Sequence, residues 1–248
     1  MKVAGLFIAF EGGEGAGKTT QSQLLADRLA DLDVSCLLVR EPGGTELGEY
    51  LRDYLKSDRP LSREAELLLF EAARVELVTS LILPALEDEQ VVVADRFYGS
   101  TVAYQGYGRG LDLDVIHSLN HFATRSIAPD MVFLLDLAPE VGIKRAMSFQ
   151  TTFTEGTSGE LVALERTREG TRFEDLDMEF HHKAQEGFLA QAGAEPQRWV
   201  QVNAMQPVDE IKDEVWERVR ERLFPAATAK PRTARKMAPQ GELWPQAT

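Results

Sequence analysis

Eight residues near the N-terminus have the types and the spacing that bind phosphate groups. The segment Gly12 to Thr19 reads GGEGAGKT and fits the pattern GxxxxGK[ST]. Glycines allow the backbone to turn tightly, so that its N–H groups and the positive end of a following helix converge on phosphate oxygens. Lys18 is expected to reach the β and γ phosphates, and the Thr19 hydroxyl is expected to ligate Mg²⁺. We therefore predict an ATP site formed by these residues: Gly12, Gly13, Glu14, Gly15, Ala16, Gly17, Lys18, Thr19 and Thr20.

The elements around this segment are those that such a loop needs. Short apolar runs alternate with longer amphipathic segments, which is typical of a parallel sheet wrapped by helices. Each run is apolar throughout, as expected of strands that are buried on both faces. The predicted strands are Leu6 to Phe10, Ser35 to Val39, Val91 to Ala94, Met131 to Leu135 and Trp199 to Val202. Helices are predicted to start near Lys18, Glu46, Glu64, Asp114, Glu140, Phe173 and Val208, with Pro84 closing the third. The fold class is α/β, with a five-stranded parallel sheet of the P-loop NTPase type.

Composition excludes several classes of protein. The 248 residues carry a net charge of −13, which opposes nonspecific binding to nucleic acid and requires any phosphate site to be concentrated. The single cysteine, Cys36, cannot form an internal disulfide, which suits a reducing compartment. The apolar run before the glycine-rich loop is read as a strand and not as a signal peptide, and no apolar stretch reaches the roughly 20 residues of a membrane span. We expect a cytoplasmic protein with neither nucleic acid nor membrane as a partner.

Two segments interrupt the alternation of strands and helices. Residues 148–171 are rich in Thr, Gly and Glu without a clear apolar period, and they are interpreted as a mobile excursion from the domain. Residues 225–248 combine Pro, Ala, Thr and Gln with four basic residues, and they are interpreted as a disordered basic tail, with a partner-binding arm as the alternative. The domain is therefore expected to span residues 1–224.

The residues after the third predicted strand favour a kinase over other P-loop proteins. Guanine-reading switches carry an NKxD sequence, whereas Asn120 and Asn203 are followed here by His and Ala. Motor ATPases usually end this strand in a pair of acids, whereas here it ends in Asp95-Arg96. An arginine at this place suits an anionic acceptor.

Four further motifs appear along the chain: Arg40-Glu41-Pro42-Gly43-Gly44-Thr45, Phe70-Glu71-Ala72-Ala73-Arg74, Asp95-Arg96-Phe97, and Ser100-Thr101-Val102-Ala103-Tyr104-Gln105-Gly106. Together they closely resemble the thymidylate kinase family, over roughly residues 5–222. The resemblance implies the topology of nucleoside monophosphate kinases and transfer of a phosphoryl group from MgATP to dTMP, giving dTDP for dTTP synthesis. It also implies a homodimer, for which the apolar helix from Ala65 to Leu83 is a candidate surface.

The resemblance also assigns roles on the acceptor side. Phe70 and Arg74 are four residues apart on one helix, where a ring can stack on thymine and a guanidinium can bond its carbonyl edge. Without the resemblance, Phe70 would be read as a core residue. The other matched positions are Arg96 and Arg40 for the acceptor phosphate, Ser100, Thr101 and Gln105 for the base, Tyr104 for exclusion of a 2′-hydroxyl, and Glu14 for the 3′-hydroxyl. Asp95 either orients Arg96 or lies near the metal.

The reaction needs charge neutralisation more than a general base, because the acceptor phosphate is already ionised near neutral pH. The variable loop positions, Gly13 to Ala16, contain no basic residue. In one form of the family this charge comes from a lid, here about residues 148–172, which contributes Arg166, Arg168 and Arg172. Arg172 matches the lid arginine best, although the choice among the three is open. The predicted catalytic residues are thus Lys18, Arg96, Arg168 and Arg172.

Two other functions are compatible with the phosphate loop. One is a P-loop kinase that acts on a different monophosphate, against which Phe70, Arg74 and Tyr104 argue. The other is a nucleotide-sensing protein that contacts a partner through its basic tail, against which Lys18, Thr19 and the lid arginines argue.

Overall fold

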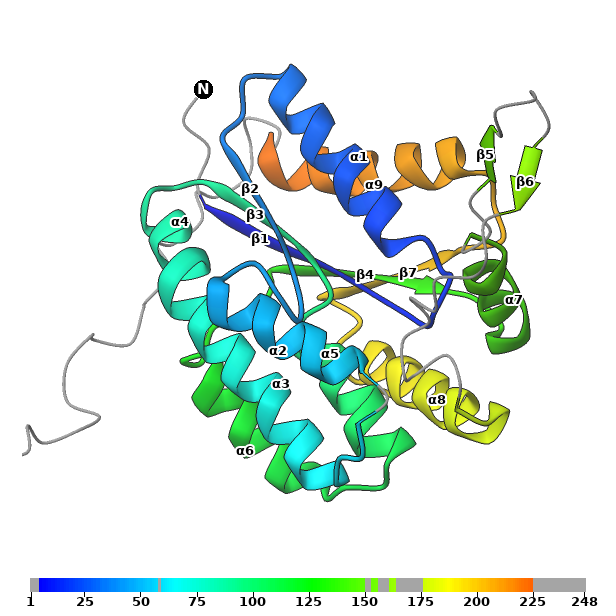
Figure 1. Ribbon diagram of the computed structural model, residues 1–248. Coiled ribbons are helices and arrows are strands. Elements are labelled where there is room, and N and C mark those ends of the chain that lie inside the picture. Colours follow the sequence, from blue (N-terminus) through cyan, green and yellow to red (C-terminus); the bar gives the residue numbers. More distant parts are fainter. Residues whose placement is uncertain (1–4, 58, 150–152, 156–160, 164–175, 225–248) are drawn as a thin grey trace, which may run out of the picture.

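A five-stranded parallel sheet forms the centre of the molecule in the computed structural model (Figure 1). The structure describes residues 5–57, 59–149, 153–155, 161–163 and 176–224. The strands are β1 (Leu6–Glu11), β2 (Cys36–Arg40), β3 (Val91–Asp95), β4 (Met131–Asp136) and β7 (Trp199–Asn203), in the spatial order β2-β3-β1-β4-β7. The predicted fold class and all five predicted strands are confirmed. Each strand runs one residue further than predicted, to a polar residue at its carboxyl end.

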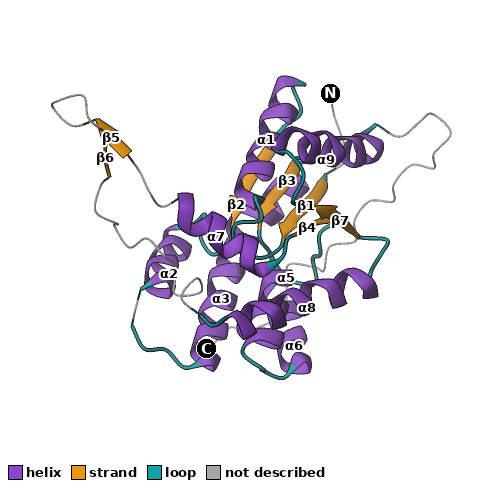
Figure 2. Cartoon of the chain, turned by 90° about the vertical axis from the view of Figure 1, so that its right-hand side faces the viewer, coloured by secondary structure: helices purple, strands orange, loops and turns teal. Residues whose placement is uncertain are grey.

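The sheet is buried on both faces because successive side chains of its strands point to opposite sides. In β1, Phe7 and Ala9 join one core cluster, whereas Leu6, Ile8 and Phe10 join the other. Figure 2 shows helices α1 (Lys18–Asp31) and α9 (Val208–Leu223) on one side of the sheet, and α3 (Arg63–Leu77), α6 (Leu113–Ala123) and α8 (Met178–Ala194) on the other. Two layers of helices therefore exclude water from the strands and fix where the strands end.

The helical segment that begins with α3 continues past Pro84, where the sequence predicted its end. It is followed by a π-helical segment, η1 (Val78–Ile82), and by α4 (Leu83–Glu87). Pro84 lies in the first turn of α4, where the missing backbone N–H of proline costs little. The prediction that Pro84 closes this helix is wrong for that reason.

The motif Ser100 to Gly106 lies on a helical segment that the sequence did not predict. Helix α5 (Tyr98–Thr101) leads into a second π-helical segment, η2 (Val102–Gly108). Like η1, this segment has wider turns than an α-helix, and π-helical turns occur frequently at functional sites. Helix α2 (Glu46–Lys56) lies beside α3 and completes this side of the sheet.

The excursion expected over residues 148–171 is only partly covered by the described residues. Helix α7 (Pro139–Phe149) reaches into it, and two short strands, β5 (Phe153–Glu155) and β6 (Leu161–Ala163), pair antiparallel. The helix predicted near Phe173 begins instead at Met178, because Asp177 caps it by accepting a 2.9 Å hydrogen bond from the Phe180 N–H. The lid arginines Arg166, Arg168 and Arg172 and the predicted tail lie outside the described residues. Among the described helices, none has the length and apolarity of a membrane span.

Candidate active site

The glycine-rich loop joins β1 to α1 and has a backbone that only glycine adopts easily. Gly12, Gly15 and Gly17 all have positive φ, and a Cβ on Gly15 would lie 2.1 Å from the Gly142 carbonyl oxygen. Gly17 precedes α1, whose first turn has neither an acidic residue nor a side-chain cap. The positive end of the helix is therefore left for a ligand, as an anion site requires.

Lys18 begins α1 and folds back over the loop. Its Nζ donates to the Gly13 carbonyl at 2.6 Å, and its side chain is only 6% exposed. Burial and the nearby charge of Arg96 lower the pKa of Lys18 to about 8. An anion at the loop would supply the negative charge that this buried ammonium group needs.

Thr19 and Asp95 lie together at the carboxyl ends of β1 and β3. The Thr19 hydroxyl donates to Asp95 Oδ2 at 2.5 Å. A hydroxyl oxygen beside a carboxylate oxygen is a suitable pair of donors for Mg²⁺, which prefers oxygen ligands. The described residues contain no cluster of three or more His, Cys, Asp or Glu side chains that would hold a metal without a substrate.

Arg96 crosses from the end of β3 to the phosphate loop. Its guanidinium bonds Glu14 Oε1 at 2.7 Å and the Gly12 carbonyl at 3.2 Å, while Tyr104 also donates to Glu14 at 3.0 Å. Burial alone would raise the pKa of Glu14, but the charges of Arg96 and Lys18 outweigh it and hold this pKa at about 2. Arg96 itself has a positive φ of 72°, a conformation that a non-glycine residue adopts only when its surroundings fix it.

Glu11, which the sequence reading did not single out, supplies part of that constraint. It is buried, and its carboxylate accepts hydrogen bonds from the N–H groups of Phe97 and Ser100 and, at 2.6 Å, from the Ser100 hydroxyl. Burial raises the pKa of Glu11. An acidic residue directly after a buried apolar run was the signal that could have identified it.

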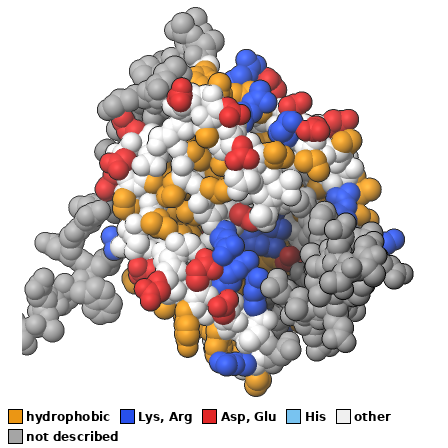
Figure 3. All heavy atoms as spheres, turned by 45° about the horizontal axis from the view of Figure 1, so that its top comes forward, with side chains coloured by type: hydrophobic (Ala, Val, Ile, Leu, Met, Phe, Trp, Pro, Cys, Tyr) orange, Lys and Arg blue, Asp and Glu red, His pale blue; other side chains and the backbone are white. Residues whose placement is uncertain are grey.

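A cavity of about 480 Å³ brings the two halves of the predicted site together. The predicted acceptor residues all line it: Glu14, Arg40, Phe70, Arg74, Arg96, Ser100, Thr101, Tyr104 and Gln105. Lys18, Thr19, Thr20 and Asp95 line it as well, whereas Gly12, Gly13 and Ala16 do not. Figure 3 shows basic side chains gathered in one hollow of this face, although the chain as a whole is acidic.

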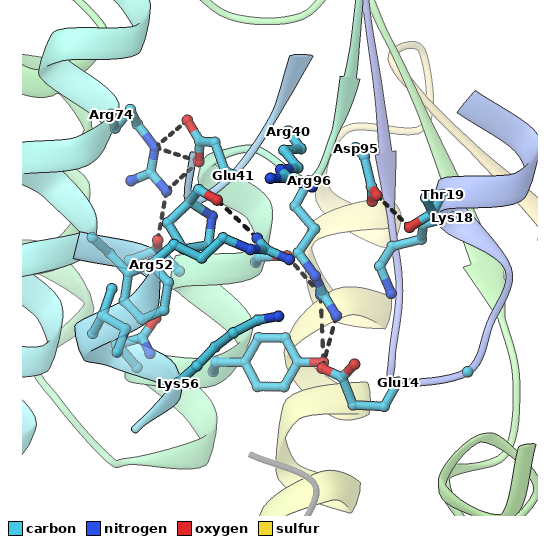
Figure 4. A pocket seen from close by; sticks show the side chains of 18 of the residues that line it. Glu14, Lys18, Thr19, Arg40, Glu41, Arg52, Lys56, Arg74, Asp95 and Arg96 are labelled. Atoms are coloured by element: carbon cyan, nitrogen blue, oxygen red, sulfur yellow. Dashed lines mark hydrogen bonds and ion pairs between the residues drawn. The ribbon is translucent and has the colours of Figure 1, made fainter. Parts of the chain in front are cut away.

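Two basic residues of α2, Arg52 and Lys56, also line the cavity and were missed by sequence reading (Figure 4). Arg52 donates to the Pro42 carbonyl at 2.8 Å, and burial together with the charge of Arg40 lowers its pKa. Arg40 is about half exposed and pairs with Glu49 at 2.9 Å. Basic positions four apart on a helix share one face, which was the signal available in the sequence.

Arg74 is nearly enclosed and makes a hydrogen bond with each of its donors. Its five N–H groups reach Glu41, Glu71, Asn120 and Thr101 at 2.7–3.1 Å. Burial alone would lower the pKa of Arg74. The charges of Glu41 and Glu71 outweigh this effect and raise the pKa above its ordinary value, so the guanidinium stays charged. Although Arg74 lines the cavity, it has no spare donor for a base in this arrangement.

Phe70 is half-buried and borders the cavity, so it is not enclosed in the core. It precedes Arg74 by one helical turn in α3. Thr101, which also lines the cavity, accepts from Arg74 at 2.8 Å, which leaves its own hydroxyl hydrogen to point elsewhere. An apolar ring and polar hydroxyl groups in one cavity suit a planar, polar-edged ligand.

Helix α7 contacts the loop after β7 on the other side of the phosphate loop. Arg145 of α7 donates to the Ala204 carbonyl at 2.9 Å. The loop from Asn203 to Pro207 is therefore held beside α7.

A phosphate loop that shares one cavity with a cluster of arginines on a parallel α/β sheet defines a P-loop kinase that acts on small anionic acceptors. The comparisons agree with this class. The family model "Thymidylate kinase" matches residues 10–215. The chain is 47% identical to a thymidylate kinase of Synechococcus sp. (strain JA-3-3Ab) over 89% of this chain and 98% of that protein. It is 43% identical to the thymidylate kinase of Thermomicrobium roseum, over 87% and 94% of the two chains.

A solved structure supports the same conclusion. The crystal structure of thymidylate kinase from Ehrlichia chaffeensis matches with a TM-score of 0.69 and 31% identity, over 87% of this chain and 99% of that one. The chain belongs to the thymidylate kinase family.

Proposed function

We propose that this kinase transfers the γ-phosphoryl group of ATP to the 5′-phosphate of dTMP, giving dTDP and ADP for dTTP synthesis. One observation carries the proposal: the phosphate loop and the cluster of Arg40, Arg52 and Arg96 line a single cavity. Two polyanions can therefore meet there, each with its own set of positive charges.

The triphosphate lies on the glycine-rich loop, with Lys18 and the N-terminus of α1 facing its β and γ phosphates. Thr19, with Asp95 beside it, would hold Mg²⁺, which would supply positive charge to neutralise the phosphates. The loop after β7, which Arg145 holds in place, borders the adenine through main-chain groups.

The acceptor lies at the other end of the cavity. Phe70 stacks on the thymine, while Ser100, Thr101 and Gln105 face its polar edge. Thr101 donates its hydroxyl hydrogen to a base carbonyl, because Arg74 already occupies one of its lone pairs. Tyr104 crowds the 2′ position of the sugar, so that a ribonucleotide fits less well.

Arg96 exchanges Glu14 for the acceptor phosphate. The guanidinium is paired with Glu14, and an incoming phosphate offers a stronger, bidentate partner. Glu14 is then released toward the sugar 3′-hydroxyl. The charge that builds up on the transferred phosphoryl group is neutralised by Lys18, by Arg96 and by the lid arginines Arg168 and Arg172.

The protein works in the cytoplasm as a homodimer, without nucleic acid as a partner. Helices α3 and α6 pack together and expose Leu68, Val115 and Phe122, each at least half accessible. Such an apolar surface suits a second copy of the chain. Sedimentation of the purified protein at a mass near 27.6 kDa would contradict the dimer.

Release of ADP from MgATP tests the activity. The acceptors to compare are dTMP, dUMP, dGMP, dCMP, AMP, UMP and a blank. We expect strong turnover with dTMP and weaker turnover with dUMP, both abolished in a folded Lys18→Met variant. Turnover with another monophosphate but not with dTMP would show that Phe70 and its neighbours do not select thymine. Tight ATP binding without ADP release for any acceptor would favour a nucleotide sensor.

A further inference from the structure

A buried carboxylate lies directly behind the amide of Gln105. Glu66, on α3, is 1% exposed, and its Oε1 accepts a 3.0 Å hydrogen bond from Gln105 Nε2. Gln105 is itself only 2% exposed but lines the cavity, whereas Glu66 does not. The carboxylate thus contacts a residue of the cavity wall through this amide.

Arg109 fixes the other side of the carboxylate. Its Nε donates to Glu66 Oε1 at 3.1 Å and one terminal nitrogen donates to Oε2 at 2.9 Å. The guanidinium in turn lies over the ring of Phe180, 5.0 Å from its centroid. A carboxylate paired in this way offers hydrogen-bond acceptors only, so its neighbours must all present donors to it.

This requirement decides which end of the Gln105 amide faces the cavity. An amide has one donating and one accepting end, and the two ends are interchanged by a half turn. One N–H of the NH₂ group bonds Glu66, which turns this end of the amide toward α3 and leaves the carbonyl oxygen as the end for the cavity. Within the described residues, the Gln105 side chain bonds Glu66 through its NH₂ group, so the carbonyl oxygen is the acceptor that it can offer to a ligand.

We propose that Glu66 is a positioning residue that makes Gln105 read position 3 of a pyrimidine as a hydrogen-bond donor. Thymine and uracil carry an N–H at this position and are accepted, whereas cytosine carries a bare nitrogen there and faces the carbonyl oxygen unfavourably. The inference rests on the proposed function, which places the base of dTMP against Gln105. It adds a residue outside the cavity that sets the choice of base.

The variant Glu66→Gln tests this role, because a glutamine at position 66 can either donate or accept and so lets the Gln105 amide turn over. The comparison uses dUMP and dCMP, since both lack the 5-methyl group and differ only at positions 3 and 4 of the base. We expect the ratio of kcat/KM for dUMP over dCMP to fall by about tenfold or more, with an absolute gain for dCMP. Glu64→Gln, on the same helix but exposed, serves as the matched control with an unchanged ratio.

A double-mutant cycle separates positioning from a merely structural effect. If Glu66 acts through the amide, Glu66→Gln has no further effect on the ratio in a Gln105→Met background, where the amide is absent. A ratio that is unchanged in Glu66→Gln, or that changes equally in both backgrounds, would overturn the proposal. Calorimetric binding of dUMP and dCMP gives the same ratio without turnover.

A measurement on the parent protein covers the case in which Glu66→Gln does not fold. The ¹⁵N signal of the Gln105 side-chain NH₂, assigned by its loss in Gln105→Met, is expected to shift little when dUMP is added. A large shift would mean that the NH₂ group faces the base, and would refute the role of Glu66. A parent protein that neither binds nor phosphorylates dTMP would instead refute the proposed function itself.

Discussion

The guanidinium of Arg96 donates a 2.7 Å hydrogen bond to Glu14 Oε1, so the residue that follows β3 is held directly against the phosphate loop. Both side chains are about 17% exposed, which leaves the pair partly shielded from water. Glu14 therefore neutralises Arg96, and this pair joins the phosphate loop to the segment that follows β3.

The pH dependence of stability is the first consequence of this pair. The pKa of Glu14 is about 2 in the folded protein, below its ordinary value of 4.5. Its ionised form thus stabilises the fold fully above about pH 4.5, and this contribution is lost as the pH falls toward 2. We expect Glu14→Gln to unfold at lower urea concentration than the parent at about pH 6, with a gap in unfolding free energy that narrows toward about pH 3.

The control for this experiment is Glu221→Gln, an exposed position on α9. Its unfolding free energy should follow that of the parent at every pH. A gap between Glu14→Gln and the parent that stays constant across the range would show that the carboxylate of Glu14 does not have a depressed pKa.

Phe70→Ala is expected to weaken dTMP binding by about 1–3 kcal/mol, because a stacked base loses its aromatic partner. Isothermal titration of dTMP measures the loss directly. Glu64→Ala is a suitable control, because Glu64 belongs to the same helix but is exposed and does not line the cavity. An unchanged affinity for dTMP in a folded Phe70→Ala variant would show that this ring only packs against its neighbours and does not stack on the base.

Arg172→Ala is expected to lower kcat by about 10³-fold with little change in dTMP affinity, since a transition-state arginine acts mainly on the chemical step. Steady-state kinetics with saturating MgATP and a dTMP titration separate the two constants. Arg168→Ala is the matched variant, and the larger loss in kcat identifies the arginine nearer the transferred group. If Arg172→Ala has the same kcat as the parent, Arg172 does not take part in catalysis.

Thr19→Val is expected to raise the Mg²⁺ concentration for half-maximal rate by about tenfold or more, because the replaced hydroxyl is a metal ligand in the proposed site. Titration of MgCl₂ at fixed ATP gives this concentration. Thr19→Ser keeps the hydroxyl and should restore the parent's metal requirement. Identical Mg²⁺ curves for Thr19→Val and the parent would show that the hydroxyl does not hold the metal.

The phosphate loop could be predicted from sequence because its determinants are local. Strand, glycines, lysine and helix follow one another within β1 to α1, and the positive φ of Gly15 is a property of that short segment. The five strands could be predicted for a similar reason, since burial on both faces makes each a continuous apolar run. The family motifs then placed all the acceptor residues at one cavity.

The remaining features depend on contacts between distant segments. Arg52 lines the cavity because α2 packs on α3. The apolar positions Leu51 and Leu55 predict which face of α2 is buried, but not that the neighbouring Arg52 borders a cavity formed with distant segments. The partners of Arg74 lie as far away as Asn120, so its lack of a spare donor could not be deduced from α3 alone. The π-helical segments η1 and η2 were missed because hydrophobic periodicity does not distinguish a wide turn from an ordinary helix.

The shared guanidinium of Arg74 also bears on how this enzyme can evolve. Its acceptors come from the end of β2, from α3, from α5 and from α6, so one side chain joins four segments of the wall. A single substitution there leaves a buried charge uncompensated, at a cost of about 3–5 kcal/mol. Viable changes to this wall must therefore arise in combination, and a shift in acceptor preference is reached more easily through residues such as Phe70, which border the cavity without belonging to the ion-pair network.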